Sequence, residues 1–368
     1  KGAELDKEVL AHLIVQAVMS VRSTGVTRPE HQIAVHSFHG AEHTQPQLIN
    51  GVLLEKERSH PMMPEHIKNA KIALLNIALE IRTPETDARI TIQDPSHLQK
   101  FLDMEEEMLS KMVQSIVRTG ASAVICQKGI DDYIQHKLAE HGILAIRRVS
   151  KKDLERLRDA TGGTIITAIE DLRAEHLGNA GSITEARNGQ DAHLLIRDCK
   201  RGGFATLIIT SSTPHVGAEI RRAIEDAIGD VASALRTDKA VAGAGATEIA
   251  LALRLHSYAQ TLTGREQLAA QHFAQALEVI PVTLAENAGL DPIDMITALK
   301  AEHKKGKHNT GLDVSTGTTF DAITQGIIEP LEVKTQALSS STQVATLLLR
   351  IDDIIARGPR NTGGSAEE

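Results

Sequence analysis

The chain has 368 residues, a formal net charge of −8 at pH 7, no Trp, two Tyr and five Phe. This length accommodates two or three domains with buried cores, while the negative balance and the few aromatic rings argue against nucleic acid as a partner. The sequence contains no signal peptide and no apolar run long enough to cross a bilayer, so we expect a cytoplasmic protein with no membrane partner.

The first elements are predicted to be a helix and a strand. Apolar residues from Leu5 to Val21 recur at the spacing of one helix face, and residues from Gln32 to Phe38 favour a strand. A histidine-rich stretch, HSFHGAEHTQ, follows as a loop. Its residues His36, His39 and His43 leave two readings open, solvated loop histidines or a metal site, although no Cys accompanies them.

Short apolar runs between turn signals then predict further strands. These runs are INGVLLEK and KIALLNIALEIR, and the second is compatible with a β-hairpin or a strand pair. A third strand is expected from Ala88 to Ile92. Asp94, Pro95 and Ser96 then mark the start of a helix, because proline is tolerated at an early helical position.

The helix expected from about Leu98 to Val117 has the strongest amphipathic pattern in the chain. Its apolar stripe could pack on the core of its own domain, or it could offer Phe and Met side chains to a changing partner. The residues of interest on this stripe are Leu98, Phe101, Leu102, Met108 and Leu109.

The segment after Gly120 predicts an α/β body. ASAVICQ, IDDYIQHKLAEHG and ILAIRRV read as strand, helix and strand, which is the pattern of a parallel crossover. A helix from Lys151 to Asp159 follows, and HLLIRDC and FATLIIT are predicted to be two more strands. Cys126 and Cys199 fall in this body without metal-ligand spacing, so we expect two small buried thiols rather than a disulfide.

The stretch from Glu219 to Leu251 joins two helical patterns through a small-residue loop, Ala242 to Ala246. Such a loop either lets helices pack closely or lets backbone approach a ligand at the start of a helix. Asp226 lies off the apolar stripe, one turn after Arg222. It could form a surface ion pair, or it could act on a water beside a nucleotide.

Helices dominate from Ala246 onward, interrupted by the strand-like pieces NTGLDVSTGTTFD and GIIEP. The tail from Gly358 to Glu368 lacks an apolar pattern and is expected to be disordered. The predicted fold class is therefore multidomain α and α/β, with a middle domain inserted between two parts of another body. No Walker, G-x-G-x-x-G, G-x-S-x-G or H-E-x-x-H motif occurs.

Long ordered phrases give the chain a specific resemblance to a group II chaperonin subunit of the thermosome type. The phrases are KGAELDKEVLA, GVLLEKERSHPMMP, NAKIALLN, QKFLDMEEEML, ICQKGIDDYIQHKLA, GATEIALAL, AENAGLDPIDM, EPLEVKTQAL and LLRIDDII. The resemblance implies a double-ring chaperone that uses ATP, with Mg2+, to fold client proteins. Its partners would be other chaperonin subunits, identical or different, and unfolded clients.

The resemblance also implies domain boundaries. Residues 1–48 and 204–240 resemble the intermediate domain, and residues 49–203 the inserted α/β apical domain with a helical protrusion at about 93–118. Residues 241–368 resemble the C-terminal part of the helical equatorial domain.

Several site residues follow from the resemblance. Asp226 matches the aspartate that acts on the hydrolytic water, and Gly243, Ala244 and Gly245 match a glycine triplet that contacts nucleotide. Positions beside the base and an acidic residue on the ribose are matched by Asp313, Val314 and Glu329. The helix carrying Leu98, Phe101, Leu102, Met108 and Leu109 matches the built-in lid, whose exposed side chains contact other lids or clients.

Two departures from the family pattern are visible. Ala244 stands where the triplet has glycine, and its methyl group is either tolerated or crowds the nucleotide. The phosphate- and Mg2+-binding motifs of the family lie N-terminal to Lys1, so we expect no ATP hydrolysis if these residues are the complete molecule. The alternative to a hydrolysing subunit is a non-hydrolysing client-binding or scaffold protein derived from a chaperonin.

Overall fold

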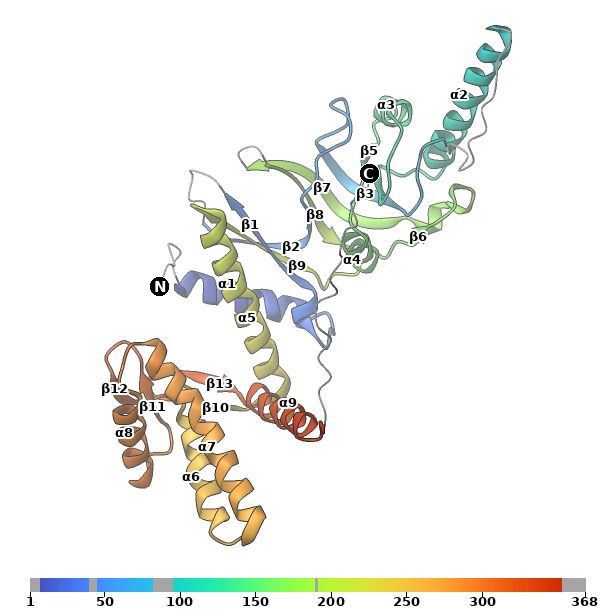
Figure 1. Cartoon of the computed structure of the whole chain (residues 1–368). Helices are drawn as coiled ribbons and strands as arrows, with labels where there is room; N and C mark the ends of the chain where they lie inside the picture. Colours follow the sequence, from blue (N-terminus) through green and yellow to red (C-terminus); the bar gives the residue numbers. More distant parts are fainter. Residues whose placement is uncertain (1–6, 40–44, 82–94, 189–190, 353–368) are drawn as a thin grey trace, which may run out of the picture. The chain divides into compact units, whose positions relative to one another are not determined.

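A computed structural model of the chain describes residues 7–39, 45–81, 95–188 and 191–352 (Figure 1). The chain divides into two compact units, Lys1–Ala232 and Ser233–Glu368. The expected strand from Ala88 to Ile92, His43 of the histidine loop and the tail from Gly358 lie outside the described residues.

The first unit is built on a nine-stranded mixed sheet with the order β1-β9-β2-β8-β7-β3-β4-β5, and β6 pairs with β3 (Figure 1). The strands are β1 (Ile33–His39), β2 (Gln47–Leu54), β3 (His66–Leu75), β4 (Ala123–Cys126), β5 (Leu144–Ile146), β6 (Ile165–Ile166), β7 (Gly178–Asn188), β8 (Asp191–Cys199) and β9 (Ala205–Ser211). Strands β1 and β9 are parallel, so segments far apart in the sequence meet in one sheet.

Helices connect and cover these strands. They are α1 (Lys7–Arg22), α2 (Pro95–Arg118), α3 (Asp132–Glu140), α4 (Lys151–Thr161) and α5 (Pro214–Thr237), with short 3-10 turns at Pro29–His31, Ile169–Asp171 and Ala174–His176. The Asp131 side chain caps α3, and that of Ser150 caps α4, by accepting hydrogen bonds from first-turn amides. The predicted crossover is confirmed, because β4 and β5 are parallel and α3 lies between them in sequence.

The core of this unit lies around β3, β4 and β5, where strand residues such as Ile72, Leu74 and Ile125 are fully buried. Apolar and polar residues do not alternate along these strands, because both faces of the sheet are covered there. The expected hairpin within KIALLNIALEIR is wrong, since β3 ends at Leu75 and, among the described residues of this run, Leu79 forms an isolated bridge to Ile130.

Both thiols are free, Cys126 buried and Cys199 half-buried, and burial raises the pKa of each to about 11.

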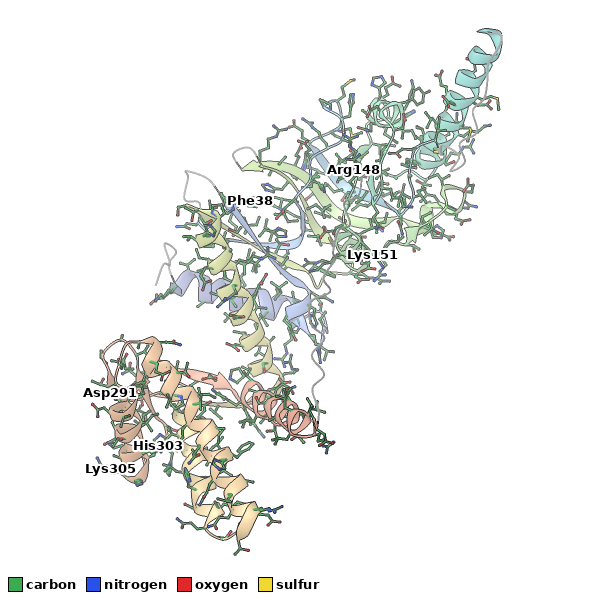
Figure 2. All side chains as sticks on the ribbon, viewed as in Figure 1. Phe38, Arg148, Lys151, Asp291, His303 and Lys305 are labelled. Carbon is green, nitrogen blue, oxygen red and sulfur yellow. The ribbon has the colours of Figure 1, made fainter. Side chains whose placement is uncertain are left out.

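The second unit is mainly helical and contains two two-stranded sheets (Figure 2). Its elements are β10 (Ala240–Ala242), α6 (Ala246–Ala259), α7 (Gly264–Asn287), α8 (Pro292–Lys304), β11 (Thr310–Asp313), β12 (Thr318–Asp321), β13 (Ile328–Pro330) and α9 (Leu331–Leu349). Its core includes Ile249, Ala285, Leu299 and Leu312. Strand β10 pairs with β13, which brings the loop after β10 next to Glu329.

Candidate functional site

The loop between β10 and α6 is a tight turn of small residues. The Gly243 amide donates to the Ile327 carbonyl at 3.0 Å, and the Ala246 amide donates to the Gly243 carbonyl at 3.0 Å. Ala244 and Gly245 both have left-handed backbone, with φ of 54° and 78°. The turn therefore delivers the chain into the first turn of α6, where amides without helical partners favour an anion.

Ala244 occupies a conformation that suits glycine. An L-residue in the left-handed region carries a steric cost of about 1–2 kcal/mol that glycine does not. The loop is also tightly packed, because a Cβ added at Gly245 would come within 2.8 Å of Pro281 Cβ. Ala244, which stands where the family triplet has glycine, therefore has a strained backbone conformation, with φ of 54°.

Strand β11 ends at Asp313 beside the same loop, and Val314 begins the turn that follows the strand. The Leu312 amide donates to the Ala244 carbonyl at 2.9 Å, so the residue before Asp313 is tied to the turn. Asp313 Oδ1 accepts from the Ser315 hydroxyl at 2.6 Å and from the Ser315 amide at 2.9 Å. These hydrogen bonds lower the pKa of Asp313 to about 2. Asp313 is therefore ionised at neutral pH, and the Val314 side chain beside it is 46% exposed.

Glu329 lies on the other side of the turn. Its Oε1 atom is 3.1 Å from the position that a Cβ on Gly243 would occupy. Its Oε2 atom is 2.6 Å from Lys334 Nζ, and this ammonium is also 2.6 Å from Oε1 of the buried Glu248. Burial lowers the pKa of Lys334, but the hydrogen bonds to Glu248 and Glu329 outweigh it, so the net shift is upward.

The structure thus brings together Gly243, Ala244, Gly245, Asp313, Val314 and Glu329 within the second unit. Glu248 and Lys334 also lie in this part of the structure, although no motif in the sequence indicated them. These two residues are 86 positions apart, and no spacing pattern links them. The available signal was the charge of Glu248 in the first turn of a mainly apolar helix.

Asp226 lies on α5 in the first unit, with an exposed side chain. The alternative surface pair with Arg222 is not formed; instead, the neighbouring residues Arg221 and Glu225 pair at 2.8 Å. Among the residues that the structure describes, none forms a hydrogen bond or ion pair with the Asp226 carboxylate. This carboxylate is therefore free to act as a proton acceptor.

Helix α2 turns its described residues to two different environments. Met104 and Met108 are 62% and 50% exposed, whereas Leu109 is 7% exposed and belongs to the core around β3 to β5. Leu109 therefore packs inside the unit rather than offering a contact surface. The side chains of Leu98, Phe101 and Leu102 lie outside the described residues.

The histidine loop gives no metal centre in the described part of the chain. His36 Nδ1 is 2.7 Å from Glu55, and His39 Nδ1 is 3.1 Å from the Ser211 hydroxyl. Across residues 7–39, 45–81, 95–188 and 191–352, no three His, Cys, Asp or Glu side chains converge as metal ligands.

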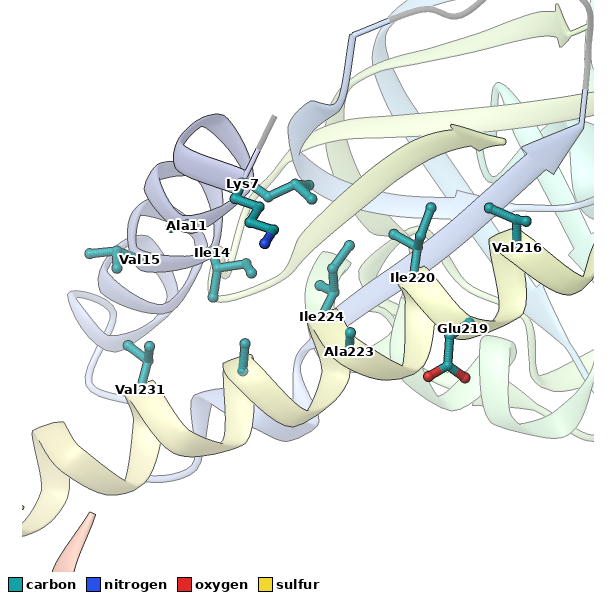
Figure 3. A pocket seen from close by; sticks show the side chains of 12 residues that line it. Lys7, Ala11, Ile14, Val15, Val216, Glu219, Ile220, Ala223, Ile224 and Val231 are labelled. Atoms are coloured by element: carbon teal, nitrogen blue, oxygen red, sulfur yellow. The ribbon is translucent and has the colours of Figure 1, made fainter. Parts of the chain in front are cut away.

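An apolar groove of about 570 Å³ lies between α1 and α5 (Figure 3). Ile14, Ile220, Ile224 and Val231 line it, and Glu219 is among its few polar side chains. Nucleotide sites need convergent polar groups, so this lining does not suit a nucleotide.

Sequence comparison supplies the family. The sequence model of the TCP-1/cpn60 chaperonin family matches residues 1–359. The chain belongs to this family.

Individual chaperonins support the same assignment. A thermosome subunit of Methanocaldococcus jannaschii is 51% identical over 359 residues, which are 97% of this chain and 66% of that protein. The thermosome subunit beta of Methanothermobacter thermautotrophicus is 48% identical over 368 residues, covering 100% of this chain and 68% of that protein. This chaperonin chain therefore spans about two thirds of the length of these relatives.

A solved structure agrees with the fold. The open-state monomer of a group II chaperonin from Methanococcoides burtonii matches with a TM-score of 0.69 and 39% identity, covering 95% of this chain and 82% of that one. The multidomain α and α/β fold class is thereby confirmed. Within the described ranges of this chaperonin chain, no helix combines the length and apolar character needed to cross a bilayer.

Proposed function

We propose that this chain acts in an ATP-dependent chaperone subunit that assembles with other chaperonin subunits into a double ring and folds client proteins. One observation carries the proposal. The Gly243–Gly245 turn opens α6 between Glu329 on one side and the strand leading to Asp313 and Val314 on the other. This arrangement supplies backbone amides, a carboxylate and an apolar side chain around one helix start, which suits an adenine nucleotide.

Each residue then has a chemical role. The backbone of Gly243, Ala244 and Gly245 contacts the nucleotide, and Glu329 accepts a hydrogen bond from a ribose hydroxyl. Val314 packs against the base, for which its 46% exposure leaves room. The ionised Asp313 fixes the turn that carries Val314, because its carboxylate accepts hydrogen bonds from Ser315.

Asp226 is proposed as the general base that orients and deprotonates the attacking water. Its free, exposed carboxylate supports this role, since a carboxylate committed to an ion pair is a poorer proton acceptor. The proton of the water passes to Asp226 while the water oxygen attacks the terminal phosphorus and the phosphorus–oxygen bond to ADP breaks.

Mg2+ is expected with the nucleotide, whose phosphate oxygens would supply part of its ligands. Mg2+ commonly takes one or two carboxylates together with phosphate oxygens and waters. No three ligating side chains converge in the described part of the chain. We therefore assign no step to the metal through these residues.

The domain boundaries remain as the resemblance implies them. Residues 1–48 and 204–240 form the intermediate domain, a proposal supported by the parallel pairing of β1 with β9. Residues 49–203 form the apical domain with α2 as its lid helix, and residues 241–368 belong to the equatorial domain. The exposed Met104 and Met108 are proposed as lid or client contacts, because methionine adapts to varied apolar partners.

One observation favours the alternative, a scaffold that does not hydrolyse ATP. Ala244 has φ of 54° where the family triplet has glycine, so its methyl group lies at the backbone position proposed to contact the nucleotide.

A chimeric subunit distinguishes the hydrolysing subunit from the scaffold. In this chimera, the N-terminal third of the Methanocaldococcus jannaschii thermosome subunit is placed ahead of Lys1. We expect this chimeric subunit to form rings and to turn over ATP. Rings without turnover would support the scaffold and overturn the ATPase proposal.

A further inference from the structure

Lys334 links Glu329 of the candidate nucleotide site to Glu248 at the start of α6. It lies in the first turn of α9, and its side chain is only 16% exposed. Its ammonium is 2.6 Å from Glu248 Oε1 and 2.6 Å from Glu329 Oε2. One cation is therefore shared between a carboxylate at the start of α6 and the carboxylate of Glu329 in strand β13.

Glu248 fixes the position of this cation. Its side chain is 4% exposed, and it lies in the first turn of α6, directly after the small-residue loop. Among the described residues, Oε2 of Glu248 is buried with no hydrogen-bond partner. A buried carboxylate depends strongly on its one cation, so Lys334 is held against α6 rather than free to move with solvent.

Glu329 is held by one oxygen and presents the other. Oε2 contacts Lys334, whereas Oε1 faces the loop, 3.1 Å from where a Cβ on Gly243 would lie. Its side chain is 34% exposed, and within the described part of the chain no donor is bonded to Oε1. A carboxylate fixed in this way offers a preorganised acceptor to a hydroxyl group, because no rotamer has to be frozen on binding.

We propose that Lys334 is a positioning residue for ribose recognition: anchored on Glu248, it holds Glu329 so that Oε1 accepts a hydrogen bond from a ribose hydroxyl. This inference rests on the proposed nucleotide site and adds two residues to it. Lys334 touches neither the nucleotide nor the reacting atoms; it acts only through Glu329.

The test compares ATP with 2′,3′-dideoxy-ATP, which lacks both ribose hydroxyls, as ligands of the full chain. Dissociation constants are measured by ligand-detected NMR titrations, which also resolve weak binding. We expect the parent chain to prefer ATP about tenfold, the usual effect of a hydrogen bond to a charged group. Lys334→Met and Glu329→Gln should both reduce this preference to less than about twofold, and Lys334→Arg should restore most of it.

Two further variants are controls for a general loss of structure. Lys300→Met breaks a comparable pair with Glu278, 2.7 Å long and in the same unit, and should leave the ribose preference unchanged. If Lys334→Met fails to fold because Glu248 is left unpaired, Lys334→Met combined with Glu248→Met removes both buried charges. Circular dichroism confirms folding, and the preference of this double variant should also fall below about twofold.

The outcomes separate the inference from the function on which it rests. A folded Lys334 variant that keeps the tenfold preference overturns the positioning role but leaves the nucleotide site standing. A variant that weakens ATP and dideoxy-ATP equally also overturns it, because that result indicates a merely structural role. If the parent chain binds neither nucleotide, the proposed nucleotide site is contradicted. If the parent chain binds ATP and dideoxy-ATP equally, the proposed hydrogen bond to the ribose is contradicted.

Discussion

The methyl group of Ala244 lies against Gly311, and a Cβ added at Gly311 would come within 2.7 Å of it. The amide of the next residue, Leu312, donates to the Ala244 carbonyl at 2.9 Å. The turn before α6 and the strand before Asp313 are therefore held together by backbone contact. This contact fixes the position of the turn relative to Asp313 and Val314, the proposed base-side part of the site.

Ala244→Gly should stabilise the protein. Glycine relieves the steric cost of φ 54° at this position, and the greater entropy of its unfolded chain offsets part of the gain. We expect the free energy of unfolding to rise by about 0.5–1 kcal/mol, measured by urea denaturation. Ala250→Gly, inside α6, is the matched control and should lower it by about 0.5–1 kcal/mol. Equal losses in both variants would show that Ala244 is not strained.

The stability of the second unit should fall as pH drops below about 6.5, because of His303. This ring is 2% exposed, and Nε2 forms a hydrogen bond with the Thr310 carbonyl at 2.8 Å. Burial, and to a smaller extent nearby His308, lowers its pKa against a smaller opposing effect of the Thr310 bond. The unfolded state therefore takes up a proton that the folded state resists, and stability declines from pH 6.5 down to the folded pKa.

Urea denaturation between pH 5 and 8 checks this dependence. His303→Gln should flatten the slope in that window, whereas His272→Gln, an exposed histidine of α7, should leave it as in the parent. A slope that persists unchanged in His303→Gln would assign the effect to other groups.

Leu109→Ala and Met108→Gln should have opposite consequences although the residues are adjacent. Leu109 is buried in the core, so its truncation should cost about 2–5 kcal/mol of unfolding free energy. Met108 is half exposed, so its replacement should change stability by less than about 0.5 kcal/mol. Met108→Gln should instead weaken binding of a permanently unfolded test protein by about 0.5–1 kcal/mol, measured by fluorescence anisotropy. Unchanged client binding would remove Met108 from the contact surface.

The sequence predicted most elements because their patterns are local. The helix stripe of α5 is confirmed by burial of Ile220, Ile224 and Ile228, and the crossover through α3 is confirmed by the parallel pairing of β4 and β5. Strand β7 was missed because GNAGSITEARN is rich in glycine and polar residues. Its strand conformation depends on its neighbours β3 and β8 rather than on its own pattern.

The candidate site was only partly predictable, for a related reason. The loop residues and Glu329 were reached through resemblance, whereas Lys334 and Glu248 form a contact between distant parts of the chain. The exposure of Met108 and burial of Leu109 likewise depend on where α2 meets the core, which the stripe alone did not specify.

ATP turnover by the chimeric subunit carrying Asp226→Ala tests the central claim most directly. Glu225→Ala is the control, because Glu225 is the adjacent exposed carboxylate and pairs with Arg221 at 2.8 Å. We predict that Asp226→Ala lowers kcat by about 10²–10⁴-fold while ATP binding is retained, and that Glu225→Ala hydrolyses ATP as the parent does. Turnover by Asp226→Ala equal to that of Glu225→Ala would contradict the proposed role of Asp226 in ATP hydrolysis.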